Sequence, residues 1–295
     1  MIPPRDRTLA GMGLGVLAYT LFSLHDASNK WLVAFLPVWQ VLFFRSATIV
    51  IGCIAIGRAP LLARAIETPL KGPLIFRGLI TLAAWLCYYT AARTLPLAQL
   101  LTLYFSAPLM TTLLAIPLLG EQVSASRWVS VVIGFLGVVV ASGVWSESQT
   151  VHASLPTALV LIAACLWGYA IILMRQIARR ETSMLQMFYQ NLCFLLVTGV
   201  LTALTWTPPT GFELLLLLAV GVLGGLGQFS LFEGARLVPA SVMATVEYSA
   251  LIWGFILGYL IWGDIPSTPI VLGAVLILAA GLFLVVMERR AQNRA

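Results

Sequence analysis

The sequence predicts an all-α integral membrane protein with ten transmembrane helices, and three observations support this fold class. Of the 295 residues, 60% are hydrophobic and only 9% are charged, and the mean hydropathy is +0.99; soluble domains carry roughly 25% charged residues. The apolar residues form continuous runs of about 20, the length of a membrane-spanning helix, and not the alternating segments of a β-barrel. At roughly 25 to 30 positions a span, ten spans leave almost no chain for an extramembrane domain.

The first five predicted helices lie between proline, glycine and charged residues that interrupt the apolar runs. The first apolar run continues into polar His25, Asp26, Asn29 and Lys30, which favours a span over a cleaved signal peptide. The fourth helix is predicted to start next to Pro96, because proline is favoured where a helix starts. The predicted ranges are Leu9 to Trp31, Pro37 to Gly57, Leu74 to Arg93, Leu97 to Leu119 and Trp128 to Val144.

The second five predicted helices follow the same punctuation. The sixth ends before Arg175, the ninth follows Pro239 and ends before Gly263, and the tenth ends before two arginines. Their predicted ranges are Leu155 to Met174, Met184 to Thr205, Glu213 to Arg236, Ser241 to Trp262 and Ile270 to Met287.

The basic residues predict that both termini are cytoplasmic. With the N-terminus inside, the outer side keeps only Lys30 and Arg93, and Arg45 stands alone in the middle of the second helix. The inner side collects Arg5, Arg7, Arg58, Arg64, Lys71, Arg77, Arg127, Arg175, Arg179, Arg180, Arg236, Arg289, Arg290 and Arg294.

The chain also matches itself when it is shifted by 143 positions. Arg93 and Pro96 meet Arg236 and Pro239 without a gap. Further matches pair Thr102, Ser106, Ala107, Gly120 and Ser124 with Thr245, Ser249, Ala250, Gly263 and Ser267. Two similar halves of five helices each must be inverted relative to one another, which predicts a pocket near the midplane between them.

The segments around these matches, from Ala92 to Glu121 and from Ala235 to Asp264, resemble the EamA repeat of the drug/metabolite transporter superfamily. The resemblance covers nearly the whole chain. It implies two repeats, residues 1–149 and 150–295, in a multi-pass secondary transporter of the inner membrane. Among its branches the chain looks most like bacterial exporters of aromatic and other neutral amino acids. A cationic drug or a nucleotide precursor is the alternative cargo.

A polar side chain at bilayer depth must face a partner, a cavity or water, because insertion costs about 2.5–3.5 kcal/mol for a charged residue. His25 and Asn29 share one face of the first helix, with Asp26 beside them. They are candidates for substrate contact or proton handling, or else an interfacial cap in water. Arg45 could bind a carboxylate of the substrate, or pair with a carboxylate or helix carbonyls and hold two helices together. Glu247 is a candidate ammonium ligand or coupling site, or a structural partner of Arg45.

Aromatic residues inside the predicted spans provide the other half of a candidate cavity, because Trp and Tyr otherwise prefer the membrane interface. Packing and lipid-facing positions are the alternative for each of them. Rings with a few polar atoms suit a zwitterion that carries an apolar or aromatic side chain. The candidates are Trp85, Tyr88, Tyr89, Tyr104, Trp167, Tyr169 and Tyr248, with Ser106 and Gln228 as hydrogen-bonding groups.

The sequence gives no support to other classes of function. The four cysteines lie singly in apolar runs, so no disulfide, metal site or cofactor is expected. The scattered basic residues indicate topology and no nucleic-acid partner. No phosphate-binding loop and no HExxH motif occurs, which disfavours an ATP-driven pump and a membrane enzyme. The expected partners are a small-molecule substrate and the bilayer, with monomer and homodimer left open.

Overall fold

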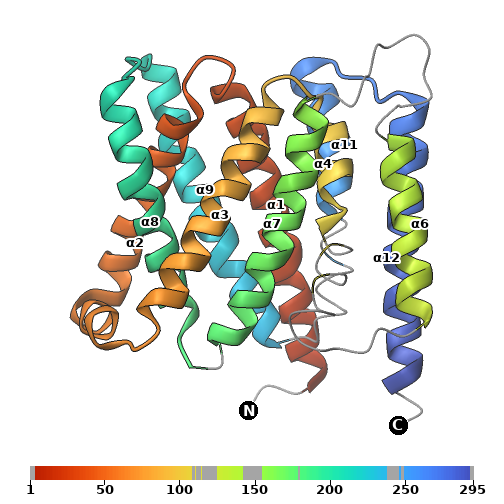
Figure 1. Ribbon diagram of the computed structural model, residues 1–295, viewed down its shortest axis with the longest axis horizontal. Helices are drawn as coiled ribbons and strands as arrows, with labels where there is room; N and C mark the ends of the chain where they lie inside the picture. The colour runs from red at the N-terminus through yellow and green to blue at the C-terminus, as the bar shows by residue number, and fades with distance from the viewer. Residues whose placement is uncertain are drawn as a thin grey trace.

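A computed structural model shows the described part of the chain to be all-helical. It describes residues 4–107, 110, 114, 125–141, 155–178, 180–237, 246 and 249–292. These residues form ten α-helices, and no strand occurs among them. The helices stand side by side, with the first turn of α1 and the last turn of α12 at the same end of the bundle (Figure 1).

The helix bounds follow the predicted ranges with a few differences. The first five are α1 (Pro4–Leu32), α2 (Val38–Glu67), α3 (Lys71–Ala92), α4 (Leu97–Tyr104) and α6 (Ala125–Ala141). The second five are α7 (Leu155–Ala178), α8 (Ser183–Leu204), α9 (Gly211–Leu237), α11 (Ser249–Trp262) and α12 (Thr268–Gln292). Helix α4 ends at Tyr104. Most of the residues between this point and the predicted end at Leu119 lie outside the described residues.

Five of the described helices are long and apolar enough to cross a membrane by length and composition. Three shorter apolar helical segments are Val132–Ala141, Ser249–Trp262 and Thr268–Phe283. The five long segments are Val38–Glu67, Lys71–Ala92, Leu155–Met174, Ser183–Leu204 and Gly211–Leu231.

Helix α2 breaks directly after Gly57, where the sequence predicts its end, and continues into a second segment that was not predicted. The backbone at Arg58 has φ 47° and ψ −148°, so the axis changes direction after the predicted end at Gly57. A second helical segment, residues 59–67, follows with Pro60 in its first turn, where a proline needs no hydrogen bond to its missing N–H. Leu61 and Ala65 of this segment are buried in a cluster with residues at the start of α8.

The helices pack in pairs that join distant parts of the chain. Helix α1 lies along α9, α3 along α7, α2 along α8, α4 along α11, and α6 along α12. Glycines of α9 allow a close approach to α1. A Cβ added at Gly227 would lie 2.9 Å from Phe22 Cε1 of α1. In the α6–α12 pair, a Cβ at Gly137 would lie 2.9 Å from the Gly273 carbonyl oxygen.

Candidate functional site

A buried polar network surrounds His25 and Arg45, where α1, α2, α3, α8 and α9 meet. His25 and Arg45 are 0% and 1% exposed. The Arg45 guanidinium donates from Nε to His25 Nε2 over 3.0 Å and from Nη1 to Asn191 Oδ1 over 3.2 Å. The other imidazole nitrogen, Nδ1, lies 3.1 Å from Asp26 Oδ1. Both contacts are satisfied by the neutral tautomer that carries its hydrogen on Nδ1.

Asn29 joins the network from the turn above His25. Its Nδ2 donates to the Tyr89 hydroxyl over 2.6 Å and lies 3.1 Å from His25 Nε2. Its Oδ1 is buried and has no hydrogen-bond partner. The Asn29 Oδ1 atom is therefore a free acceptor within the network.

Aromatic rings of α3 form one wall of the network. The Arg45 Cζ atom lies 4.1 Å from the Trp85 ring centroid, a cation–π contact. Trp85 also contacts the rings of His25 and Tyr89 edge to face, at centroid distances of 5.6 and 5.3 Å. Tyr88 extends the wall toward α4, with its ring 4.9 Å from that of Tyr104.

The Arg45 guanidinium and the Asp26 carboxyl group of the network do not touch directly. Within the described residues, Arg45 forms no ion pair with a carboxylate, and His25 stands between it and Asp26. The Asp26 side chain is 19% exposed and accepts a long hydrogen bond of 3.5 Å from the Tyr88 hydroxyl. A guanidinium and a carboxylate are thus held on either side of one imidazole.

Close packing by glycine makes room for this arrangement. A Cβ at Gly224 of α9 would lie 3.0 Å from His25 Cδ2 and 3.1 Å from Arg45 Nε. Any larger residue at this position would press on both partners of the central hydrogen bond. Gln228 lies one turn along the same face of α9, buried, with its Oε1 unpaired.

The structure corrects one expectation for these residues. His25 and Asn29 are at most 1% exposed, so the alternative of an interfacial cap in water is wrong for them. The described hydrogen-bond partners of Arg45 are an imidazole from α1 and a side-chain amide from α8, and Glu247, its predicted partner, lies outside the described residues.

The remaining candidates divide between the network and other places. Ser106 is fully buried just beyond α4, and its hydroxyl has no partner. Tyr169 packs instead against the exposed Phe76, at a centroid distance of 6.2 Å, and Trp167 is half-buried in α7. Glu247 and Tyr248 lie outside the described residues.

Sequence reasoning missed the contribution of α8. Asn191 supplies the second acceptor of Arg45, and Gln186 and Gln190 are buried beside it at 2% exposure each. The signal was available, because three amide side chains within six positions of an apolar run are expensive in a bilayer.

Both ends of the α2–α8 pair are closed by polar contacts. At the end where α8 begins, the Glu181 carboxylate accepts two hydrogen bonds from Arg64, of 2.9 and 2.8 Å, and a third from the Thr68 hydroxyl. At the other end, the Gln40 amide donates to the Thr207 carbonyl and accepts from the Thr207 N–H.

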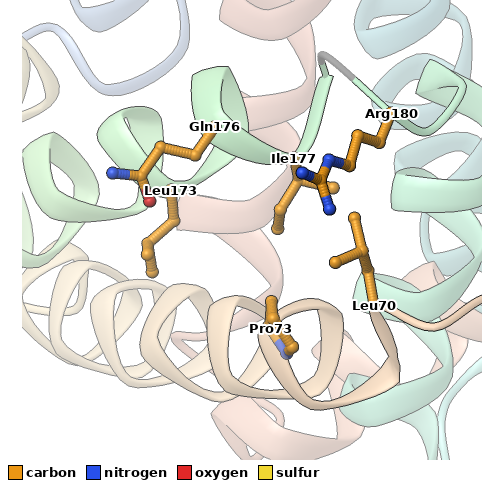
Figure 2. A pocket seen from close by; sticks show the side chains of 6 residues that line it. All are labelled: Leu70, Pro73, Leu173, Gln176, Ile177 and Arg180. Atoms are coloured by element: carbon orange, nitrogen blue, oxygen red, sulfur yellow. The ribbon is translucent and has the colours of Figure 1, made fainter.

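Two pockets lined by described residues lie away from Arg45 and His25. The larger, of about 330 Å³, lies between the start of α3 and the end of α7. Figure 2 shows Leu70 and Pro73 facing Ile177 and Leu173 across it, with Gln176 and Arg180 near its edge. The smaller, of about 260 Å³, has an apolar lining that includes Trp31 and Phe212. No group of His, Cys, Asp and Glu in the described residues could hold a metal ion.

Comparisons with known proteins agree with a transporter. The model of the EamA-like transporter family matches residues 9–143 and again 155–287. The S-adenosylmethionine uptake transporter of Rickettsia felis is 29% identical over 97% of this chain and 96% of its own. The pseudopaline exporter CntI of Pseudomonas aeruginosa is 30% identical over 93% and 95%, and a riboflavin transporter of Vibrio cholerae is 24% identical over 75% and 72%.

A solved structure described as "Crystal structure of protein" has the same fold. It superposes with a TM-score of 0.67 at 18% identity and covers 97% of this chain and 99% of its own. None of the three named relatives is named as an amino-acid exporter, so these comparisons support the family and not that branch. Because the family model matches nearly the whole chain in two copies, this protein is a membrane transporter that belongs to the EamA-like transporter family.

Proposed function

We propose that the chain is a secondary transporter that exports amino acids, aromatic and other neutral ones, and related amino-acid metabolites across the inner membrane. The observation that carries the proposal is the buried Arg45 guanidinium, which has no carboxylate partner among the described residues and stacks on Trp85. A buried cation without a counterion binds an anionic group of a ligand strongly, because its own desolvation is already complete.

The distance between the two charges suits an α-amino carboxylate. The path from Asp26 Oδ1 through the imidazole to Arg45 Nε spans about 8 Å, with hydrogen bonds of 3.1 and 3.0 Å at its two ends. An α-amino carboxylate that bonds a carboxylate with its ammonium and a guanidinium with its carboxylate, at about 2.8 Å each, spans a similar length. The head group therefore fits where the imidazole now bridges, once His25 turns away.

The aromatic wall would accept the remainder of such a substrate. Trp85 is half-buried, so part of its ring is free of protein contacts, and Tyr88 and Tyr104 continue the ring surface. Rings of this kind bind flat or apolar side chains by stacking and by area burial. S-adenosylmethionine, the cargo named for the Rickettsia relative, is itself an amino acid with an aromatic base.

An inverted repeat of residues 1–149 and 150–295, with five spans in each half and both termini cytoplasmic, forms part of the proposal. The two family matches, one in each half, support it. The helix pairs support it too, because exchange of the halves converts the α1–α9 pair into the α7–α3 pair and leaves α2–α8, α4–α11 and α6–α12 unchanged. Such symmetry provides two alternative arrangements of the same halves around one site.

Transport by alternating access requires the closed network to open toward each side in turn. The contacts at the two ends of α2–α8, Arg64 with Glu181 and Gln40 with Thr207, are the barriers that we assign to the two sides. One named relative takes up its substrate and another exports it, so the direction of transport differs between members of the family. Export is the direction implied by the resemblance to bacterial amino-acid exporters.

A cationic drug is the second candidate cargo, favoured by one observation. Asp26 is partly exposed beside Tyr88, and a carboxylate next to aromatic rings is a suitable site for an organic cation. The two candidates differ in their need for Arg45, because a cation without a carboxylate gains nothing from a guanidinium.

The test is counterflow in proteoliposomes with labelled tryptophan, methionine and S-adenosylmethionine, and with ethidium and riboflavin as other cargoes. We expect saturable exchange of the amino-acid substrates, loss of at least about tenfold in affinity in Arg45→Gln, and partial recovery in Arg45→Lys. Lys71→Gln, which removes an exposed cation, is the matched control and should not change exchange. Exchange of ethidium alone, unaffected by Arg45→Gln, would refute the amino-acid cargo and favour the drug.

A further inference from the structure

A second buried cation without an ion pair among the described residues, Arg77, lies in α3 away from the network described above. It is 3% exposed, and its Nε is buried without a hydrogen-bond partner. No described carboxylate forms an ion pair with it. A guanidinium inside a membrane protein normally has a partner. Since no described residue accepts a hydrogen bond from Arg77 Nε, this atom is available to a ligand.

Arg77 faces the interior of the bundle on the same stripe of α3 as the candidate site. Arg77, Thr81, Ala84 and Tyr88 follow each other at spacings of four, three and four, and all are buried. At 1.5 Å per residue, Arg77 lies about 16 Å from Tyr88 along the helix. It therefore lies on the route between the Arg45 network and the end of the bundle where α3 begins.

Helix α8 adds acceptor groups at the same level. A Cβ at Gly78 would lie 3.0 Å from Cys193 Sγ and 3.5 Å from Gln190 Cα, so α3 and α8 are in close contact here. Gln186 and Gln190 lie on this stripe of α8 at a spacing of four, and the Oε1 of each is buried and unpaired. The Arg77 side chain leans toward the start of α3, which brings it level with these amides.

We infer that Arg77, with Gln186 and Gln190, forms a second binding station for an α-amino carboxylate, between the Arg45 network and the end of the bundle where α3 begins. Arg77 binds the carboxylate, and the amide oxygens accept hydrogen bonds from the ammonium group. The Arg77 Nε donor and the two amide oxygens then each have a hydrogen-bond partner. The inference rests on the proposed function, because it assigns a second site to the same class of substrate.

The location gives the station a defined effect on transport. A substrate that arrives from the end where α3 begins meets Arg77 before Arg45, whereas one from the opposite end meets Arg45 first. Loss of Arg77 must therefore weaken binding from one side of the membrane only.

The experiment compares right-side-out and inside-out membrane vesicles, with labelled methionine as the probe. For Arg77→Gln we expect KM to rise about tenfold at the face where α3 begins, and to stay within about twofold at the other face. Arg77→Lys should recover most of the loss, and Arg180→Gln, an exposed cation near the same end, should change neither face. An equal effect on both faces, or none at either, in a variant that elutes as the wild type in gel filtration, overturns the inference.

A second readout separates this inference from the proposed function. Thermal stabilisation of the purified protein by N-acetyl-L-tryptophan, which has a carboxylate and no ammonium, should persist in Arg45→Gln, where Arg77 remains to bind the carboxylate. It should be absent when Arg77→Gln is added to Arg45→Gln. If wild-type vesicles carry no amino acid while this stabilisation still depends on Arg77, the proposed function fails and the anion station remains. If the double variant is stabilised as much as Arg45→Gln, the station is refuted.

Discussion

Replacement of Gly224 by alanine tests whether the Arg45–His25 hydrogen bond holds the centre of the bundle together. The added Cβ would lie 3.0 Å from His25 Cδ2 and 3.1 Å from both His25 Nε2 and Arg45 Nε, closer than nearly all Cβ contacts in proteins. Since the two neighbours are joined to each other over 3.0 Å, neither can move without lengthening that bond. A buried hydrogen bond to a charged group contributes about 1.5–3 kcal/mol.

The same substitution also has a stabilising effect that must be subtracted. Alanine is favoured over glycine in a helix by about 0.8–1 kcal/mol. We therefore expect Gly224→Ala to lower the free energy of unfolding by about 1 kcal/mol net, about fivefold in the folded-to-unfolded ratio. The assay is unfolding of the detergent-solubilised protein by titration with sodium dodecyl sulfate, followed by circular dichroism.

The control and a double-mutant cycle make the result specific. Gly52→Ala in α2 has no atom within 4 Å of its added Cβ, so it should be neutral or stabilising. In a His25→Ala background, Gly224→Ala should no longer lower the stability, because the added Cβ clashes with the hydrogen-bonded pair only where the His25 imidazole is present. The reasoning is refuted if Gly224→Ala is as stable as Gly52→Ala, or if its cost persists without the His25 imidazole.

Three further predictions concern other contacts of the bundle. Glu181→Gln weakens the pair with half-exposed Arg64 by about 1 kcal/mol and should speed hydrogen exchange in the first turns of α8, whereas Glu67→Gln, at an exposed position, should not. Asn191→Leu leaves Arg45 Nη1 without its acceptor and should destabilise the protein by about 1–3 kcal/mol, while Asn191→Asp keeps an acceptor and should be at least as stable as the wild type; equal loss in both would contradict this account. Gly273→Ala brings a Cβ to within 2.5 Å of the Gly137 carbonyl oxygen and should lower the melting temperature, whereas Gly72→Ala meets no atom within 4 Å; a melting temperature that is the same in both variants would show that α6 and α12 separate without cost.

The polar residues inside apolar runs are the part of the site that a sequence can reveal. His25, Asn29 and Arg45 stand out because a polar group at bilayer depth is costly, and the structure brings all three into one network. The aromatic candidates were less predictable, since the same ring can face a cavity, a helix or lipid. Trp85, Tyr88 and Tyr89 lie at the network, but Tyr169 packs on exposed Phe76.

The sequence by itself determined the class of the fold and the approximate bounds of most helices. Runs of apolar residues about as long as the bilayer is thick leave the backbone no alternative to helices, so composition and length are sufficient. The partners of Arg45 were decided only by the tertiary structure. Asn191 is 146 positions away in the chain, and its role depends on the side-by-side position of α2 and α8. Helix pairing in a membrane depends on the fit of surfaces and small residues, such as Gly224 against His25, and a single sequence does not encode that fit in any local pattern.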